Sequence, residues 1–120
     1  TLAAQAGAVM KFVPELGGFA PLRTWFMETS VPNLYIAGDA SGVEEATTAF
    51  IEGEIAGLSA AVKLGFGGSG EVEKRDKLLE YLWKEYRESP VVARAREGKL
   101  KVTVSEEEME RIRRGECVGV

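Results

Sequence analysis

The feature that most constrains the fold of this chain is a glycine-rich turn between a short apolar run and a long apolar helix. The apolar run is Leu34-Tyr35-Ile36-Ala37, and the turn is Gly38-Asp39-Ala40-Ser41-Gly42. From Val43 to Val62, apolar residues recur at spacings suited to one side of a helix. A short apolar run between turn signals is typical of a buried strand. The order strand, tight turn, helix predicts an α/β fold that binds ligands at the carboxyl end of the strand.

Shorter elements precede this unit. We expect the end of a helix over residues 2–6, stopped by Gly7, and a short strand over 9–13. Gly17-Gly18 supplies a turn, after which residues 19–24 can extend.

Charge divides the chain into two parts. Residues 1–70 hold 3 basic and 7 acidic side chains, whereas residues 71–120 hold 12 of each. The boundary coincides with a run over 65–70 that is rich in glycine and therefore too costly in backbone entropy for a helix interior. We therefore expect a first unit over residues 1–69 and a mainly helical unit over 70–120.

The second unit begins with a predicted amphipathic helix over 72–88. Its apolar stripe consists of Leu78, Leu79, Leu82, Trp83 and Tyr86. Exposing such a stripe would favour self-association. Either the first unit or another chain should cover it.

Three further elements are expected after this helix. Ser89-Pro90 can begin a helix that Gly98 ends, and residues 100–104 alternate like a short strand. Ser105-Glu106-Glu107-Glu108 has the form of a capping box for a last helix, which Gly115 would end.

Composition excludes several classes of protein. With 15 basic and 19 acidic residues the net charge is −4, which disfavours nucleic acid as a partner. There is no histidine and one cysteine, Cys117, so zinc and internal disulfides are disfavoured. The longest apolar stretch, 56–64, is too short to span a bilayer, and the chain shows no signal peptide. We expect a soluble, cytoplasmic protein.

Residues 29–40, together with the helix through Gly57, resemble the carboxyl-terminal flavin motif of the pyridine nucleotide-disulfide oxidoreductase superfamily, flavoproteins with two dinucleotide-binding domains. The resemblance implies that the first unit is the carboxyl-terminal portion of an FAD-binding, Rossmann-like domain. Asp39 would accept a hydrogen bond from a ribityl hydroxyl of FAD, and the helix start would face the flavin ring. Gly38 allows close approach, and the helix dipole favours negative charge on the ring. The implied cofactor-binding residues are Gly38, Asp39, Ala40, Glu45, Ala46 and Thr47.

Simpler interpretations stand beside these roles. Asp39 can act as a helix cap, since aspartate is a preferred cap residue. Glu44 and Glu45 are either acid-base candidates or, more commonly, solvated carboxylates stabilised by the helix dipole. Tyr35 and the pair Trp25-Phe26 could stack on a flavin, although aromatic residues beside strands are more often part of a core.

Within the superfamily, four runs are most similar to the α subunits of heteromeric sarcosine oxidase and dye-linked L-proline dehydrogenase. These runs are residues 14–18, 40–46, 52–53 and 55–57. The similarity implies an FAD-dependent oxidoreductase subunit that exchanges electrons with NAD(P) or another redox partner, with amine oxidation at a companion subunit of an oligomer. It assigns no catalytic residue in this chain.

Two departures from the family pattern matter. The Gly-x-Gly-x-x-Gly loop that holds the FAD pyrophosphate is absent, so we expect the chain to be the final part of a longer flavoprotein. Cys117 is either a first ligand of an iron-sulfur cluster or an ordinary thiol.

Gly53 and Gly57 are interpreted as positions of close packing. The alternative function is a non-catalytic interaction or assembly module that retains the fold of a flavin-domain end.

Overall fold

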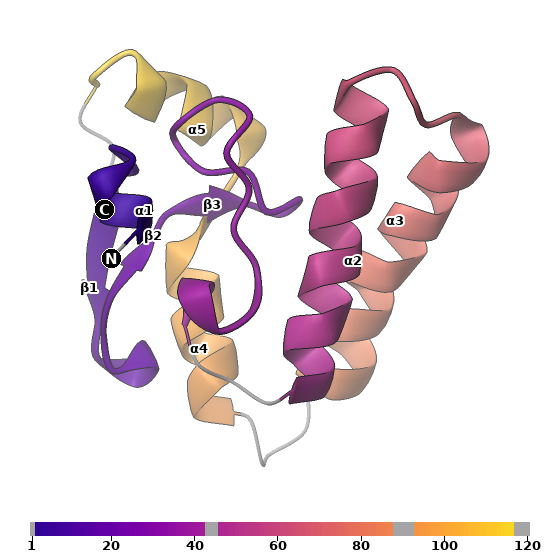
Figure 1. The fold of residues 1–120 in the computed structure, drawn as a ribbon. Coiled ribbons are helices and arrows are strands. Elements are labelled where there is room, and N and C mark those ends of the chain that lie inside the picture. Colours follow the sequence, from indigo (N-terminus) through magenta and orange to yellow (C-terminus); the bar gives the residue numbers. More distant parts are fainter. Residues whose placement is uncertain (1, 43–45, 88–92, 117–120) are drawn as a thin grey trace.

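The computed structural model describes residues 2–42, 46–87 and 93–116, and of residues 39, 46, 85 and 86 the backbone alone. The fold combines helices with short strands, which confirms the predicted mixture of α and β structure followed by a mainly helical segment. In Figure 1, a β-hairpin and the carboxyl-terminal helices form one side of the molecule, and a pair of long helices forms the other.

The amino-terminal part forms a β-hairpin. Helix α1 (Leu2–Gln5) ends before Gly7, which takes a φ of 93° that L side chains rarely adopt. Strands β1 (Met10–Val13) and β2 (Gly18–Pro21) pair antiparallel around the 3₁₀ turn η1 (Pro14–Leu16). The helix end and the extended segments predicted here are confirmed.

Segments from the amino-terminal and carboxyl-terminal parts of the chain pair in a second, parallel sheet. Strand β3 (Arg23–Thr24) pairs with β4 (Thr103–Val104), and helix α5 (Glu106–Arg113) follows. The Ser105 hydroxyl accepts a hydrogen bond from the Glu108 amide at 3.1 Å, so the predicted cap of the last helix is confirmed. Segments on opposite sides of the glycine-rich run are therefore hydrogen-bonded to each other. The division into units at residue 69 stays a prediction.

Two long helices pack side by side and run in opposite directions (Figure 1). They are α2 (Ala46–Lys63) and α3 (Ser69–Tyr81), and α3 continues into a π-helical turn, η3 (Leu82–Tyr86). The Glu71 carboxylate accepts the Gly68 amide hydrogen at 2.8 Å and so caps α3. Both helices agree with the periodicity of the sequence, but α3 begins at Ser69 and not at the predicted residue 72, so the end of the run 65–70 is helical.

The buried apolar residues form two clusters. The hairpin core lies between β1, β2, α4 (Ala93–Val102) and α5, and its buried residues are Val13, Ala20, Leu22, Val102, Val104 and Met109. The helix core lies between α2 and η3, and its buried residues are Met27, Ile51, Ile55 and Leu82.

The first part of the chain covers the predicted apolar stripe. Leu82 is fully buried against residues of α2, and Leu78, Leu79 and Trp83 pack around it. This confirms that protein covers these positions of the stripe. The side chain of Tyr86 lies outside the described atoms.

The strand predicted over residues 34–37 is wrong. This segment, which is fully described, contributes one isolated bridge, between Tyr35 and Glu28. A strand needs a neighbour that continues the ladder of hydrogen bonds. The neighbouring backbone instead turns sharply at Met27, which has a φ of 77°. Two backbone hydrogen bonds join it to this segment, from the Thr29 amide to the Leu34 carbonyl and from the Ile36 amide to the Met27 carbonyl.

Gly98 does not end a helix, and the strand predicted over 100–104 is correspondingly too long. Helix α4 continues through Gly98 to Val102, and only Thr103–Val104 is extended. Gly98 is buried because Leu16 packs against it; a β carbon there would lie 2.5 Å from the Leu16 Cγ atom. The glycine lets η1 and α4 pack closely against each other, and the spacing of residues along the sequence does not reveal such a contact.

The close packing expected at Gly53 and Gly57 is also wrong. Both glycines are exposed on α2, and a β carbon at either position would meet nothing within 4 Å among the described residues. Ile51 and Ile55 of α2 face the helix core instead.

Two features are absent from the described part of the chain. None of the helices in ranges 2–42, 46–87 and 93–116 is long and apolar enough to cross a membrane. In the same ranges, no three His, Cys, Asp or Glu side chains come together in a way that could hold a metal ion. Cys117 lies outside the described residues.

Candidate functional site

The turn singled out by the sequence is a short 3₁₀ helix, η2 (Gly38–Ser41), which leads towards the start of α2. Gly38 has a φ of 70°, in the left-handed region that favours glycine. A β carbon at Gly38 would also lie 3.3 Å from the Ala49 Cβ atom, closer than most such contacts. The turn therefore requires glycine at this position for both its conformation and its packing.

Three side chains hold the backbone of Gly38, two of them from other elements. The Gly38 amide donates a hydrogen bond to the Oε1 atom of Glu52 on α2, at 2.8 Å. The Gly38 carbonyl accepts from the Ser41 hydroxyl at 2.9 Å and from the Lys99 Nζ atom on α4 at 3.4 Å. Both polar backbone atoms of this residue are thus bound, and partners on two helices set the position of the turn.

Three cationic side chains converge on the carboxylate of Glu52. Arg23 binds it in a bidentate way, with Nη1 to Oε1 at 3.0 Å and Nη2 to Oε2 at 2.6 Å. Arg87 pairs with Oε2, and the Lys99 Nζ atom lies 3.3 Å from Oε1. Ser41 joins the cluster, because its hydroxyl lies within hydrogen-bonding distance of Arg23, Lys99 and Glu52. These five residues form the buried ion cluster.

Every member of the buried ion cluster is almost completely inaccessible to solvent. Burial by itself raises the pKa of Glu52, because it disfavours the charged carboxylate. The neighbouring charges of Arg23, Lys99 and Arg87 outweigh that effect and hold the pKa of Glu52 well below its usual range. The carboxylate is therefore ionised at any physiological pH.

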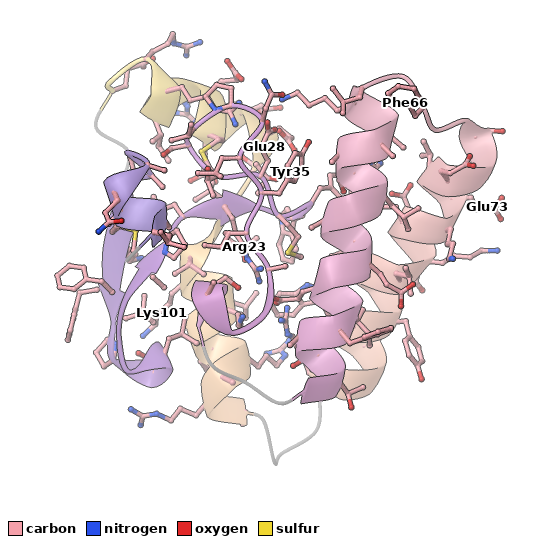
Figure 2. All side chains as sticks on the ribbon, in the orientation of Figure 1. Arg23, Glu28, Tyr35, Phe66, Glu73 and Lys101 are labelled. Atoms are coloured by element: carbon pink, nitrogen blue, oxygen red, sulfur yellow. The ribbon has the colours of Figure 1, made fainter. Side chains whose placement is uncertain are left out.

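The buried ion cluster lies between the two apolar cores. Figure 2 shows Arg23 near the centre of the molecule, between strand β3 and helix α2. Arg23 follows Leu22 of the hairpin core, and its Nη1 atom lies 2.8 Å from the sulfur of Met27 in the helix core. Glu52 follows Ile51 of the helix core along α2. The cluster therefore connects the two halves of the fold at the base of the Gly38–Ser41 turn.

The structure brings part of the predicted cofactor-binding set together. Gly38 and Ala40 lie on η2, Ala46 and Thr47 begin α2, and the side chains of Ala40 and Thr47 are exposed. The side chains of Asp39 and Ala46 and the whole of Glu45 lie outside the described atoms. The predicted contacts of these six residues with FAD stay predictions.

The three aromatic residues considered as flavin-stacking candidates contact other protein side chains. Phe26 and Tyr35 pack against the helix core, and the Arg75 guanidinium lies 3.8 Å from the centre of the Phe26 ring. Trp25 meets Trp83 edge to face, with ring centres 5.3 Å apart. These contacts agree with the core interpretation for Phe26 and Tyr35, whereas Trp25 is partly exposed and lies outside both cores.

A polar cavity of about 320 Å³ opens between α2, α3 and α5. Glu28 and Tyr35, which lie close together in Figure 2, form part of its wall. Lys63 pairs with the Glu28 carboxylate, whose pKa is lowered although burial opposes this, and Arg113 lies 3.5 Å from it. Both signs of charge line the cavity.

Sequence reasoning missed the buried ion cluster, although one signal was present. The buried positions of α2 are Thr48, Ile51, Glu52, Ile55 and Ser59. A carboxylate on the apolar face of a helix is rare unless it is paired. Glu52 therefore carried a detectable signal, whereas its cationic partners lie far away in the sequence.

Comparison with known proteins gives one short similarity. The chain is 43% identical over 49 residues to the A subunit of opine oxidase from Rhizobium meliloti. The matched segment is 41% of this chain and 11% of that protein, so the match spans about a tenth of the relative's length. No family model and no solved structure matches the chain.

Proposed function

We propose that this chain is part of an FAD-dependent oxidoreductase and supplies the turn Gly38–Ser41 and the start of α2 to the ribityl and ring side of the flavin. The observation that carries this proposal is a glycine-dependent turn, fixed by buried contacts, that leads to the amino-terminal end of an 18-residue helix. The similarity to a protein named as part of an oxidase supports the same class of reaction.

The residues of the turn fit such a cofactor. The side chains of Ala40 and Thr47 are small and exposed. The unpaired amide groups at a helix start favour electron-rich groups. When bound, FAD would supply the redox chemistry and exchange electrons with a redox partner. The role of Asp39 is to bind and orient a ribityl hydroxyl.

The finer assignment is an amine dehydrogenase or oxidase complex of the sarcosine or proline type. It rests on the motif similarities of residues 14–18 and 40–46, and the name of the opine oxidase relative is consistent with it. In such a complex NAD(P) or another redox partner would exchange electrons with the flavin, and companion subunits would oxidise the amine.

The test is the flavin content of the intact protein encoded by the complete gene. The account predicts a yellow protein with about one FAD released per chain on denaturation, measured by absorbance and by chromatography of the released flavin. An intact, folded protein that is colourless and does not take up added FAD would favour the assembly-module alternative instead.

A further inference from the structure

The buried ion cluster connects the carboxyl-terminal helix α4 to the turn Gly38–Ser41. Lys99 of α4 lies 61 positions from Gly38 in the sequence, yet its Nζ atom lies 3.4 Å from the Gly38 carbonyl oxygen. The same Nζ atom lies 3.0 Å from the Ser41 hydroxyl. Lys99 therefore contacts both ends of the turn.

A second partner of the turn is Glu52. Its Oε1 atom accepts hydrogen bonds from the Gly38 amide and from Arg23, and it also lies 3.3 Å from Lys99. One carboxylate oxygen thus joins the turn to two buried cations. The position of this oxygen therefore helps to set the position of the Gly38 amide.

Because the buried ion cluster is shielded from solvent, its geometry depends on each of its residues. An ionised carboxylate inside a protein is costly unless cations and hydrogen-bond donors compensate it. Removing the Lys99 ammonium removes a donor to the Gly38 carbonyl and a charge beside Glu52 together. The surrounding groups must then rearrange, and the turn is among the groups that they hold.

We propose that Lys99 and Ser41, acting through Glu52, are positioning residues that hold the Gly38–Ser41 turn in the conformation that binds flavin. This inference rests on the proposed function. It makes the carboxyl-terminal segment a part of the flavin site, although none of its described residues belongs to the sequence motif.

The test compares Lys99→Met with Lys101→Met in the intact protein. Lys101 lies on the same helix but is exposed, and its ammonium pairs with Glu15 at the surface. We expect Lys99→Met to weaken FAD binding about tenfold or more, as for loss of a hydrogen bond to a charged group. Lys101→Met should change the dissociation constant less than about twofold. Fluorescence titration of the apoprotein measures both.

Two further readouts separate positioning from general stability. Lys99→Arg keeps the charge and should recover most of the FAD affinity and of the visible spectrum of the bound flavin. Hydrogen exchange of the peptide that contains Gly38 should be faster in Lys99→Met than in wild type, without a similar increase in α3. Unchanged exchange and unchanged FAD affinity in a folded Lys99→Met protein would overturn the inference.

A milder variant covers the case in which Lys99→Met does not fold. Ser41→Ala removes the hydroxyl that joins Lys99, Arg23 and the Gly38 carbonyl but deletes no charge. We expect it to weaken FAD binding several-fold. Asp39→Ala separates the two proposals: if it weakens FAD binding and neither Ser41→Ala nor Lys99→Met does, this inference alone fails. If Asp39→Ala has no effect, the proposed function fails.

Discussion

The two terminal nitrogens of Arg23 bind the two carboxylate oxygens of Glu52, at 3.0 and 2.6 Å, in the interior of the protein. This bidentate pair joins strand β3, which pairs with β4 in the parallel sheet, to helix α2. Bidentate pairs of this kind fix orientation as well as distance. The pair therefore sets how α2, and with it the turn at Gly38, lies against the rest of the fold.

The first prediction concerns the pH dependence of stability. The pKa of Glu52 is lower in the folded protein than the ordinary value of 4.5. Its ionisation therefore stabilises the fold above about pH 4.5, and this contribution is lost as the pH falls from there towards the lowered pKa. Glu52→Gln should reduce the free energy of unfolding at neutral pH by about 3 to 5 kcal/mol, because it leaves the Arg23 guanidinium buried without its carboxylate.

Urea titrations of wild type and Glu52→Gln at neutral and at acid pH measure this effect. The difference between the two proteins should shrink below about pH 4.5. Glu73→Gln is the control, since Glu73 is exposed and pairs with Lys77 at the surface, and it should change stability by less than about 1 kcal/mol. A difference for Glu52→Gln that stays constant with pH would contradict this account of the cluster.

The second prediction concerns the helix core. Leu82 is fully buried against Met27, Ile51 and Ile55, so Leu82→Ala should destabilise the protein by about 2 to 5 kcal/mol. Leu64→Ala, at an exposed leucine, is the matched control and should have little effect. Because the contact is internal, light scattering should show the same oligomeric state for both variants. A normal melting temperature for Leu82→Ala would be inconsistent with the observed packing.

The third prediction concerns the contact between Leu16 and Gly98. Gly98→Ala places a β carbon 2.5 Å from the Leu16 Cγ atom, and the overpacking should cost about 1 to 3 kcal/mol. Gly57→Ala, in the middle of α2 with open space around it, should instead stabilise the protein by about 0.5 to 1 kcal/mol. Thermal unfolding measures both the predicted loss of stability and the predicted gain. In a protein that already carries Leu16→Ala, Gly98→Ala should destabilise the fold less than it does in wild type. Equal losses of stability in the two backgrounds would argue against the contact.

Local patterns in the sequence predicted the helices well and the buried contacts poorly. Apolar spacing predicted α2, and the Ser105 capping box predicted the start of α5. Periodicity describes one segment at a time, however. It could not tell that residues 34–37 meet a neighbouring backbone that turns at Met27 and so form no ladder.

The same limit applies to the site. Gly38 was evident from the turn motif, and Glu52 was detectable as a charge on the apolar face of α2. Arg87 and Lys99 lie 35 and 47 positions from Glu52, and an arginine or a lysine in a charged helical segment is usually a surface residue. Only the tertiary fold shows that these two cations are buried beside the carboxylate.

The fourth prediction concerns the 120-residue chain expressed alone. It contains the residues proposed for the ribityl side of FAD but no glycine-rich loop for the pyrophosphate. Most of the polar contacts that fix a dinucleotide are then missing, so the purified chain should be colourless. A visible spectrum with stoichiometric flavin would show that this chain binds FAD by itself, or between copies, and would contradict the proposed division of the site.

The most direct test of the central claim is the FAD affinity of Asp39→Ala in the intact protein. Loss of a charge-assisted hydrogen bond of about 1.5 to 3 kcal/mol to a ribityl hydroxyl should weaken binding roughly tenfold to a hundredfold. Glu73→Ala, at an exposed carboxylate that pairs with Lys77 on the surface of α3, should matter much less. Titration of the apoproteins with FAD, with circular dichroism as the check on folding, gives both values. The account predicts a large effect for Asp39→Ala alone, whereas a folded Asp39→Ala protein with wild-type FAD affinity would contradict it and leave Asp39 as a helix cap.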